Sequence, residues 1–358
     1  MSMEDLRRTL GAGMAMCGLI GAMSAHALPS YDDLIVFGDS LSDTGNAANF
    51  VEGAGFDLQP LYFTEPPDLV PDAPYEVSRK FTNDGPIWVE TLGAALGLPT
   101  TPFSDPAGGT VYAIGGANST DGLTGVPPES DPLFSVEEQV GIFLTERGGV
   151  APSNALYTFT VGSNDIRDAL TLAAAGGDAN LVIGESLESV VTMIATLAMA
   201  GAEDILLFNV PNLGLVPQVT LFDSFSPLEV AEQFSETSAV YNALMAAALA
   251  QLVGELAVAG IDLNLILADS YGLLTDVVAH PALYGFSEAV DSCLFFFPAP
   301  PCSDPDSYVF WDGIHPTVAM HQMIAQSAFE AIPVPGPLAL LLIGALAAWQ
   351  AKGRQTST

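Results

Sequence analysis

Residues 34–46 read LIVFGDSLSDTGN, an apolar run followed by small and acidic residues. The four apolar residues, two of them β-branched, predict a short buried strand that Gly38 ends. Ser40 then lies at the carboxyl end of this strand, where open α/β sheets place their ligand crevice. Two interpretations of Ser40 stay open on this stretch alone: a nucleophile, or a cap of the following helix, since Ser and Asp are favoured at helix starts.

The balance of charge limits the classes of partner. The chain has 358 residues, of which 42 are acidic and 8 basic, so its formal net charge is -34. Such a surface repels phosphate backbones and anionic membranes. We therefore expect no nucleic-acid partner, and membrane contact only through the C-terminal segment described below.

Residues 1–27 are typical of a secretory signal peptide. Arg7 and Arg8 precede an apolar stretch, and Ala25-His26-Ala27 matches the small-residue pattern of a cleavage site. A buried N-terminal helix is the alternative. The signal predicts a mature protein that begins at Leu28 and works outside the cytoplasm.

Residues 332–358 form a second segment with the features of a targeting signal. A Pro-rich stretch, IPVPGP, precedes an apolar run over 338–349 and a basic tail with Lys352 and Arg354. The apolar run is shorter than the about 17–25 residues that a membrane span needs. The arrangement resembles a bacterial PEP-CTERM sorting signal, with Val334 in place of the motif's Glu, which implies a sorting transpeptidase as partner and cell-surface association. A tail anchor and a docked apolar helix are the alternatives.

Cysteine usage points to the same compartment. With Cys17 in the signal peptide, the mature chain keeps Cys293 and Cys302. Two cysteines this close predict a disulfide in an oxidising compartment. The sequence has no C-x-x-C pair that would support a zinc site, and we expect neither metal nor cofactor.

Apolar runs alternate with helical patterns along the chain. Because the strand runs are apolar on both faces, they predict a parallel sheet between two helical layers in one domain over 28–331: an α/β fold, a three-layer α/β/α sandwich with a roughly five-stranded sheet. Residues 47–80 predict an irregular surface insertion. After the opening strand, we expect strands at 110–114, 155–161, 204–210 and 263–268, and helices at 86–96, 136–147, 187–200, 227–259 (with one possible break), 271–278 and 316–331.

A base for Ser40 can be found late in the chain, in Trp311-Asp312-Gly313-Ile314-His315-Pro316-Thr317. Asp and His separated by two residues can meet within one turn, so that the carboxylate fixes the imidazole tautomer and stabilises the imidazolium. A serine hydroxyl is a poor nucleophile without such a base. A surface pair that caps the last helix is the alternative. We expect the Cys293–Cys302 loop to brace this segment.

Donors for an oxyanion follow two other predicted strands. Acyl transfer needs N–H groups aimed at the developing charge, commonly from a glycine backbone and a side-chain amide. Gly115-Gly116 and Asn164 each follow a strand, as Ser40 does, and the carboxyl ends of parallel strands share one edge. Taken singly, each also fits ordinary turn chemistry.

With these segments in order, the chain resembles the GDSL, or SGNH, hydrolase family over about residues 33–330. No G-x-S-x-G elbow occurs, which disfavours the α/β-hydrolase superfamily. The segments that carry the resemblance are GDSLSDTGN at 38–46, RKFTNDG at 79–85 (with Lys80 and Asp84 as extra residues), YAIGGA at 112–117, GSND at 162–165 and DGIHPT at 312–317.

The resemblance implies that Ser40 is the nucleophile and His315 the base, oriented by Asp312. It also implies an oxyanion hole formed by the Ser40 and Gly116 N–H groups and the Asn164 amide, with Gly115 the alternative glycine. Ser42 and Asp43 are expected to hold the nucleophile loop. The expected function is a secreted serine esterase or lipase acting on small-molecule, lipid or glycan esters. An O-acetyl esterase of polysaccharides and a non-catalytic surface or matrix binding protein are the alternatives.

Overall fold

The computed structural model describes residues 30–59, 70–126, 134–226, 228–294 and 300–333. The predicted signal peptide therefore lies outside the described residues, as does nearly all of the predicted sorting segment. Residues 30–332 form one compact unit.

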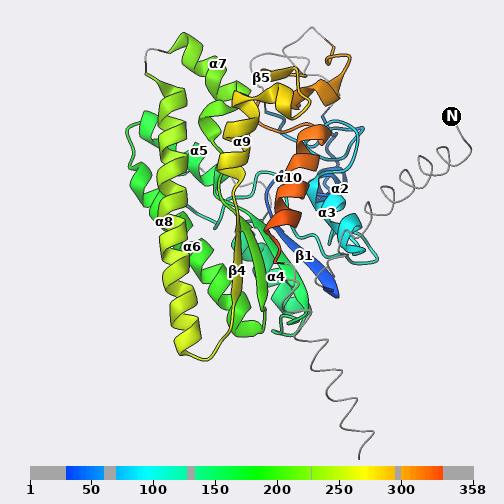
Figure 1. Ribbon diagram of the computed structural model, residues 1–358, viewed down its shortest axis with the longest axis vertical. Coiled ribbons are helices and arrows are strands. Elements are labelled where there is room, and N and C mark those ends of the chain that lie inside the picture. The colour runs from blue at the N-terminus through cyan, green and yellow to red at the C-terminus, as the bar shows by residue number, and fades with distance from the viewer. Residues whose placement is uncertain (1–29, 60–69, 127–133, 227, 295–299, 334–358) are drawn as a thin grey trace, which may run out of the picture. The chain divides into compact units, whose positions relative to one another are not determined.

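Four parallel strands form the centre of this unit (Figure 1). They are hydrogen-bonded in the order β1 (Asp33–Gly38), β2 (Ala155–Thr160), β3 (Asp204–Phe208) and β4 (Asn264–Ala268). β1 and β2 are almost entirely buried because both of their faces carry helices. The predicted parallel α/β sheet is confirmed.

The predicted strand at 110–114 is only partly formed. Its backbone runs along the free edge of β1: the N–H of Val36 donates to the carbonyl of Thr110, and that of Tyr112 to the carbonyl of Val36. The segment therefore forms an isolated β-bridge with β1 rather than a full strand. The side-chain amide of Asn46 donates to the carbonyls of Val111 and Ala113. The next backbone segment also pairs here, since the N–H of Val111 donates to the carbonyl of Thr101 and that of Phe103 to the carbonyl of Val111.

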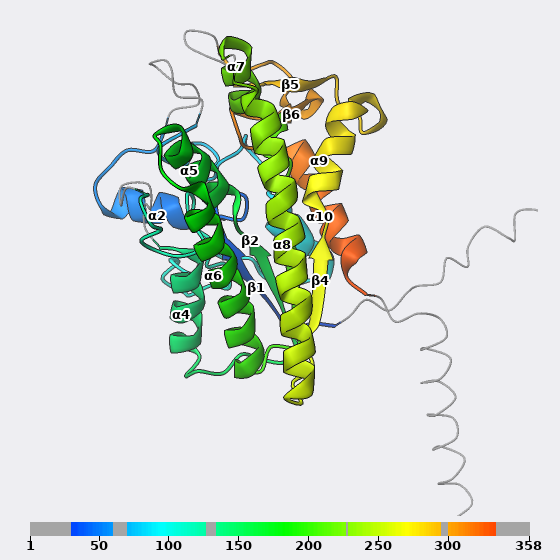
Figure 2. The same ribbon diagram turned by 90° about the vertical axis from the view of Figure 1, so that its left-hand side faces the viewer.

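Helices cover both faces of the sheet, as expected (Figure 2). One apolar core lies between the sheet and α4 (Val136–Glu146), α5 (Ser163–Ala174), α6 (Ala179–Ala200) and α8 (Val230–Val258). The core on the opposite face lies under α3 (Trp88–Leu96) and α10 (Val318–Ala331), and α9 (Ser270–Ala279) packs beside α10.

By length and composition alone, α6 and α8 could cross a membrane. Both pack on the sheet and supply side chains to its core, including Ile194, Leu197, Met245 and Leu249. Part of their apolar character therefore serves the face that they cover, while α8 also exposes Val240 and Leu244.

Several predicted boundaries were wrong. Residues 47–53, predicted to be irregular, belong to helix α2 (Asn46–Gly53), because Asp43 accepts the first backbone N–H groups. α6 begins earlier than the predicted start at 187, at a cap by Asp178, and continues through Gly184. A separate helix, α7 (Pro217–Phe225), precedes α8, which is unbroken from Val230.

The start of α10 also differs from the prediction. Pro316 was expected in its first turn, but it lies in extended backbone bridged to Phe310. The helix is capped by Thr317, whose hydroxyl accepts the N–H of Met320.

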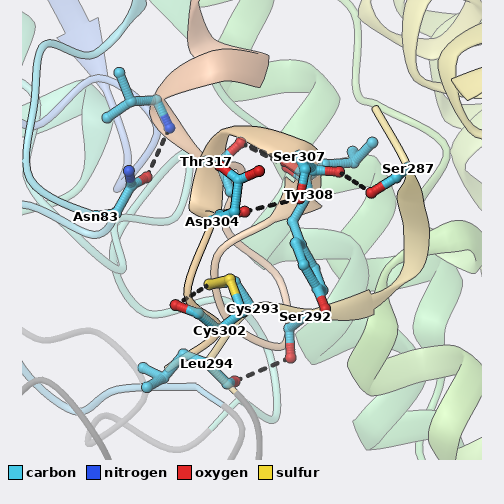
Figure 3. Close-up of a disulfide and its surroundings, with 12 residues drawn as sticks. Asn83, Ser287, Ser292, Cys293, Leu294, Cys302, Asp304, Ser307, Tyr308 and Thr317 are labelled. Carbon is cyan, nitrogen blue, oxygen red and sulfur yellow. Dashed lines mark hydrogen bonds between the residues drawn. A yellow bond between two sulfur atoms is a disulfide. The ribbon is translucent and has the colours of Figure 1, made fainter. Parts of the chain in front are cut away.

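A small sheet near the end of the domain was not predicted. It pairs β5 (Glu288–Ser292) with β6 (Tyr308–Phe310), beside the Cys293–Cys302 disulfide (Figure 3). The described residues also contain the short 3-10 turns η2 (Leu213–Leu215), η3 (Pro281–Leu283) and η4 (Pro305–Ser307). Strands this short and irregular carry little alternation in the sequence.

Candidate active site

The sharp turn after β1 presents Ser40 at the carboxyl edge of the sheet. Gly38 makes the turn possible: its φ is +150°, and a Cβ there would stand 2.2 Å from the Thr160 hydroxyl oxygen. The Gln139 side chain holds the Gly38 backbone at both ends, since its Oε1 accepts the N–H at 2.8 Å and its Nε2 donates to the carbonyl at 2.9 Å. The chain therefore leaves β1 in a fixed direction.

Two side chains after Ser40 anchor the loop, as expected. The Ser42 hydroxyl lies 2.7 Å from that of Thr160 and accepts the indole N–H of Trp88 at 3.2 Å. The Asp43 carboxylate accepts backbone N–H groups from the start of α2 and from Gly115. One buried carboxylate thus ties the nucleophile loop, α2 and the glycine segment together.

Asp312 and His315 form a buried pair after β6. His315 Nδ1 lies 2.8 Å from Asp312 Oδ2, and the two residues are only 3% and 0% exposed. Asp312 Oδ1 also accepts the N–H of Ile314 at 2.9 Å and of His315 at 2.8 Å, and Oδ2 accepts the Tyr75 hydroxyl at 2.9 Å. These bonds fix the carboxylate, and the carboxylate fixes the ring.

His315 reaches Ser40 across the top of the sheet. Its Nε2 lies 2.9 Å from Ser40 Oγ, within hydrogen-bond distance. The Phe81 ring packs on the imidazole, with ring centroids 5.2 Å apart. The three predicted residues therefore have the arrangement that a nucleophile, its base and an orienting acid require.

Residues 79–85 hold the backbone that follows His315 through hydrogen bonds. The Thr82 hydroxyl donates to the carbonyl of Pro316 at 2.8 Å, and Asn83 Oδ1 accepts the N–H of Val318 at 2.8 Å. Lys80 Nζ donates to the carbonyl of Gly85 and to Glu90, which closes the segment on α3. The contacts explain how a segment without catalytic groups contributes to the site.

The two neighbouring glycines differ in what their N–H groups do. That of Gly115 donates to Asp43 Oδ2 at 2.9 Å. Within the described part of the chain, the N–H groups of Gly116 and Ser40 make no hydrogen bond. Asn164 is 7% exposed and donates one amide hydrogen to the carbonyl of Ala117, next to Gly116, at 2.9 Å. Its second amide hydrogen is left for another acceptor, so Ser40, Gly116 and Asn164 all have a donor to offer.

Buried acids surround the nucleophile. Burial raises the pKa of Asp39 to about 6, although hydrogen bonds from Leu41 and Thr160 and the nearby His315 counteract the rise. Burial also raises the pKa of Asp43 and of Asp165, each of which accepts several hydrogen bonds. Burial lowers the pKa of His321 to about 3, and this neutral imidazole receives the Trp88 backbone N–H.

Two supporting residues were missed from the sequence. Gln139 lies in the first turn of α4, and Tyr75 lies within the stretch predicted to be an irregular insertion. A buried glutamine on an otherwise apolar helix face was the available signal for Gln139. Nothing in the sequence near Tyr75 pairs it with Asp312, which is 237 positions away.

The family comparison decides the identity of this arrangement. The family model for GDSL-like lipase/acylhydrolase proteins matches residues 34–328. The chain belongs to this family. It is a GDSL-type carboxylic ester hydrolase.

Individual relatives of this GDSL hydrolase are distant. A GDSL esterase/lipase of Arabidopsis thaliana is 27% identical over 320 residues, which cover 81% of this chain and 87% of the relative. Lipase 1 of Photorhabdus luminescens is 25% identical, over 92% of this chain and 54% of its own length. The crystal structure of LAE5, an alpha/beta hydrolase enzyme from the metagenome of Lake Arreo, is 15% identical with a TM-score of 0.42, covering 86% of this chain and 99% of that one.

A cavity of about 560 Å³ opens at Ser40 and His315. It extends over the carboxyl ends of β2 and β3, with α5 and α8 on one side and α9 and α10 on the other. Asn164 lines it near the nucleophile. Among the described residues, no cluster of three or more His, Cys, Asp or Glu side chains is placed to hold a metal ion.

Proposed function

We propose that this GDSL hydrolase cleaves carboxylic esters through an acyl-enzyme on Ser40. The observation that carries the proposal is the 2.9 Å contact between Ser40 Oγ and His315 Nε2, with His315 Nδ1 held by a buried Asp312 carboxylate. A hydroxyl in that position can lose its proton to the imidazole while it attacks a carbonyl carbon.

The reaction divides into two displacements. Ser40 Oγ bonds to the carbonyl carbon as its proton moves to His315 Nε2, and the carbonyl oxygen becomes an oxyanion facing the N–H groups of Ser40, Gly116 and Asn164. The bond to the alcohol oxygen then breaks, and this oxygen takes the proton from His315. A water repeats the sequence in place of Ser40 and releases the acid.

Ser40→Ala and His315→Ala test the assignment. Hydrolysis of p-nitrophenyl butyrate should fall by at least about 10³-fold in both variants, because both remove a member of the triad. Ser224→Ala, at an exposed serine on α7, is the matched control and should keep full activity. Fluorophosphonate labelling of the parent and of Ser224→Ala, but not of Ser40→Ala, is expected. Undiminished turnover by folded Ser40→Ala contradicts the assignment.

Asn164→Ala tests the oxyanion role separately. Loss of one such donor typically costs about 10²–10³-fold in kcat. The variant should still be labelled by the fluorophosphonate at Ser40 but should lose turnover. Labelling then measures the nucleophile, and kcat measures the stabilisation of the transition state. An unchanged kcat excludes Asn164 from the oxyanion site.

We also infer that the domain works outside the cytoplasm. The Cys293–Cys302 disulfide supports this location, because such bonds persist in oxidising compartments. The signal-like residues 1–27 and the sorting-like residues 332–358 agree with it. Mass spectrometry of the protein from culture medium and from the cell surface should give a mature N-terminus at Leu28; a cytoplasmic protein with residues 1–27 retained contradicts the location.

A further inference from the structure

The cavity that opens at Ser40 continues well beyond the space that an ester group needs. Its far wall is apolar and comes from several elements: η2, α7, α8, α9 and α10. We call this part the acyl groove. The side chains that define it are Leu213, Val219, Phe234, Leu273, Leu274 and Met320.

The size of the cavity separates short from long acyl chains. A methylene group occupies about as much volume as a water molecule in the liquid, about 30 Å³. An acetyl group therefore fills about a tenth of the 560 Å³, whereas a chain of about twelve to sixteen carbons fills most of it. An acetyl ester would leave the apolar wall in contact with water.

The chemistry of the cavity walls also favours a long acyl chain. Sugar hydroxyls need many hydrogen-bond partners when they are bound, since buried polar groups without partners are costly. Besides Asp39, Ser40 and His315, the polar side chains in the lining are those of Thr160, Ser163, Asn164, Arg167, Thr171, Asn209, Gln218, Ser226, Gln233 and Ser270. Most of the remaining lining is hydrocarbon, which suits an alkyl chain better than a glycan.

The entrance of the groove is apolar as well. Phe222 and Leu228 line the cavity and are nevertheless 59% and 65% exposed. Phe225, one turn from Phe222 on α7, is 82% exposed. Exposed apolar side chains that gather at the mouth of an apolar cavity are typical of a surface that meets an apolar ligand.

We propose that the acyl groove binds the acyl chain of long-chain esters, with about eight carbons or more, and that Leu213, Val219 and Leu273 set the chain length. The proposal rests on the proposed function, because it assumes that Ser40 attacks the carbonyl at the head of this chain. It selects a lipid-type ester over an acetylated polysaccharide as the substrate class.

A series of p-nitrophenyl esters from acetate to palmitate, at one fixed detergent concentration, tests the proposal on the unaltered protein. Each buried methylene is worth up to about fourfold in binding. We expect kcat/KM for octanoate or dodecanoate to exceed that for acetate by at least about tenfold, and acetate release from acetylated xylan to be slower than hydrolysis of either long ester. Preference for acetate, or for acetylated xylan, overturns the proposal.

Leu273→Trp tests the location of the chain. The larger side chain, from α9, should lower the dodecanoate-to-acetate ratio of kcat/KM by at least about tenfold. Ala279→Trp adds the same indole at an exposed site on the same helix, and should leave that ratio unchanged. Equal ratios in the two variants overturn the location, and the ester series on the parent decides the substrate class even if Leu273→Trp does not fold.

The outcomes separate this proposal from the one on which it rests. If Ser40-dependent acetate hydrolysis is measured but long esters are not preferred, the acyl groove fails and the proposed function stands. If no ester is hydrolysed, or if Ser40→Ala is as active as the parent, the proposed function fails.

Discussion

The two sides of the cavity are built in opposite ways. On one side, the segment 308–317 carries the buried pair of Asp312 and His315, and Asp312 is 0% exposed and accepts four hydrogen bonds. On the other side, α7 and the start of α8 offer apolar side chains, and Phe222 and Phe225 are largely exposed. Proton transfer requires fixed distances, whereas an alkyl chain requires only volume and apolar surface. The polar side should therefore tolerate substitution much less than the apolar side.

The largest effect is expected at the centre of the polar side. Asp312→Asn keeps the shape of the side chain but removes the charge that selects the His315 tautomer, and kcat for p-nitrophenyl butyrate should fall by about 10⁴-fold. Asp306→Asn, at an exposed position in η4, is the control and should change kcat by less than about twofold. A similar small loss in both variants refutes the orienting role of Asp312.

The buried acid beside Ser40 should make stability depend on pH. The unfolded carboxyl has a pKa of about 3.9, whereas burial raises the pKa of Asp39 to about 6 in the folded protein. Between these values the folded chain binds more protons than the unfolded chain, so stability falls as pH rises from 4 to 7.

Asp39→Asn should remove this dependence. The free energy of unfolding of the parent, relative to that of the variant, should fall by about 2 kcal/mol from pH 4 to pH 7. Urea unfolding at pH 4, 5, 6 and 7 measures the difference. Two curves that run parallel across the range contradict the raised pKa.

The disulfide should contribute a similar amount to the free energy of unfolding. Cys293 and Cys302 close a loop of 9 residues, for which the chain-entropy estimate is about 2.5 kcal/mol. The backbone N–H groups of Cys293 and Leu294 donate to the carbonyls of Phe310 and Trp311, directly before Asp312. We expect Cys293→Ser with Cys302→Ser to lower Tm by about 5 °C and to lower kcat. If Tm and kcat are both unchanged, the disulfide does not brace the catalytic segment.

The smallest effect is expected on the apolar side. Phe225 lies at the entrance of the acyl groove without lining it, so Phe225→Ser should raise KM for micellar dodecanoate esters only about twofold to fivefold. Val258→Ser, at the far end of α8, where the side chain is 92% exposed, is the matched control. Equal KM values in the two variants show that the entrance does not meet the substrate.

The same contrast explains what the sequence could predict. Ser40, Asp312 and His315 were predicted because each lies in a short sequence motif that resembles one of the GDSL family. The apolar runs of β1 to β4 likewise predicted strands. The Gln139 clamp on Gly38 was not, because its partner is 101 positions away.

The acyl groove was hidden for a different physical reason. Val219 and Leu274 have the same apolar character as core residues, and the periodicity of a helix does not tell a cavity wall from a packed interior. Only the three-dimensional arrangement of α7, α8 and α9 leaves the space between them unfilled. Substrate preference thus depends on packing, which a linear pattern does not record.

The distance along the chain between Ser40 and His315 has a consequence for folding. The base and its carboxylate are three positions apart and assemble within one turn, but the hydroxyl is 275 positions away. Only the docking of the segment from β6 to α10 onto the β1 loop brings them together. The onset of ester hydrolysis during refolding should therefore report the arrival of this last segment, and loss of turnover in denaturant should register its departure before the central strands separate.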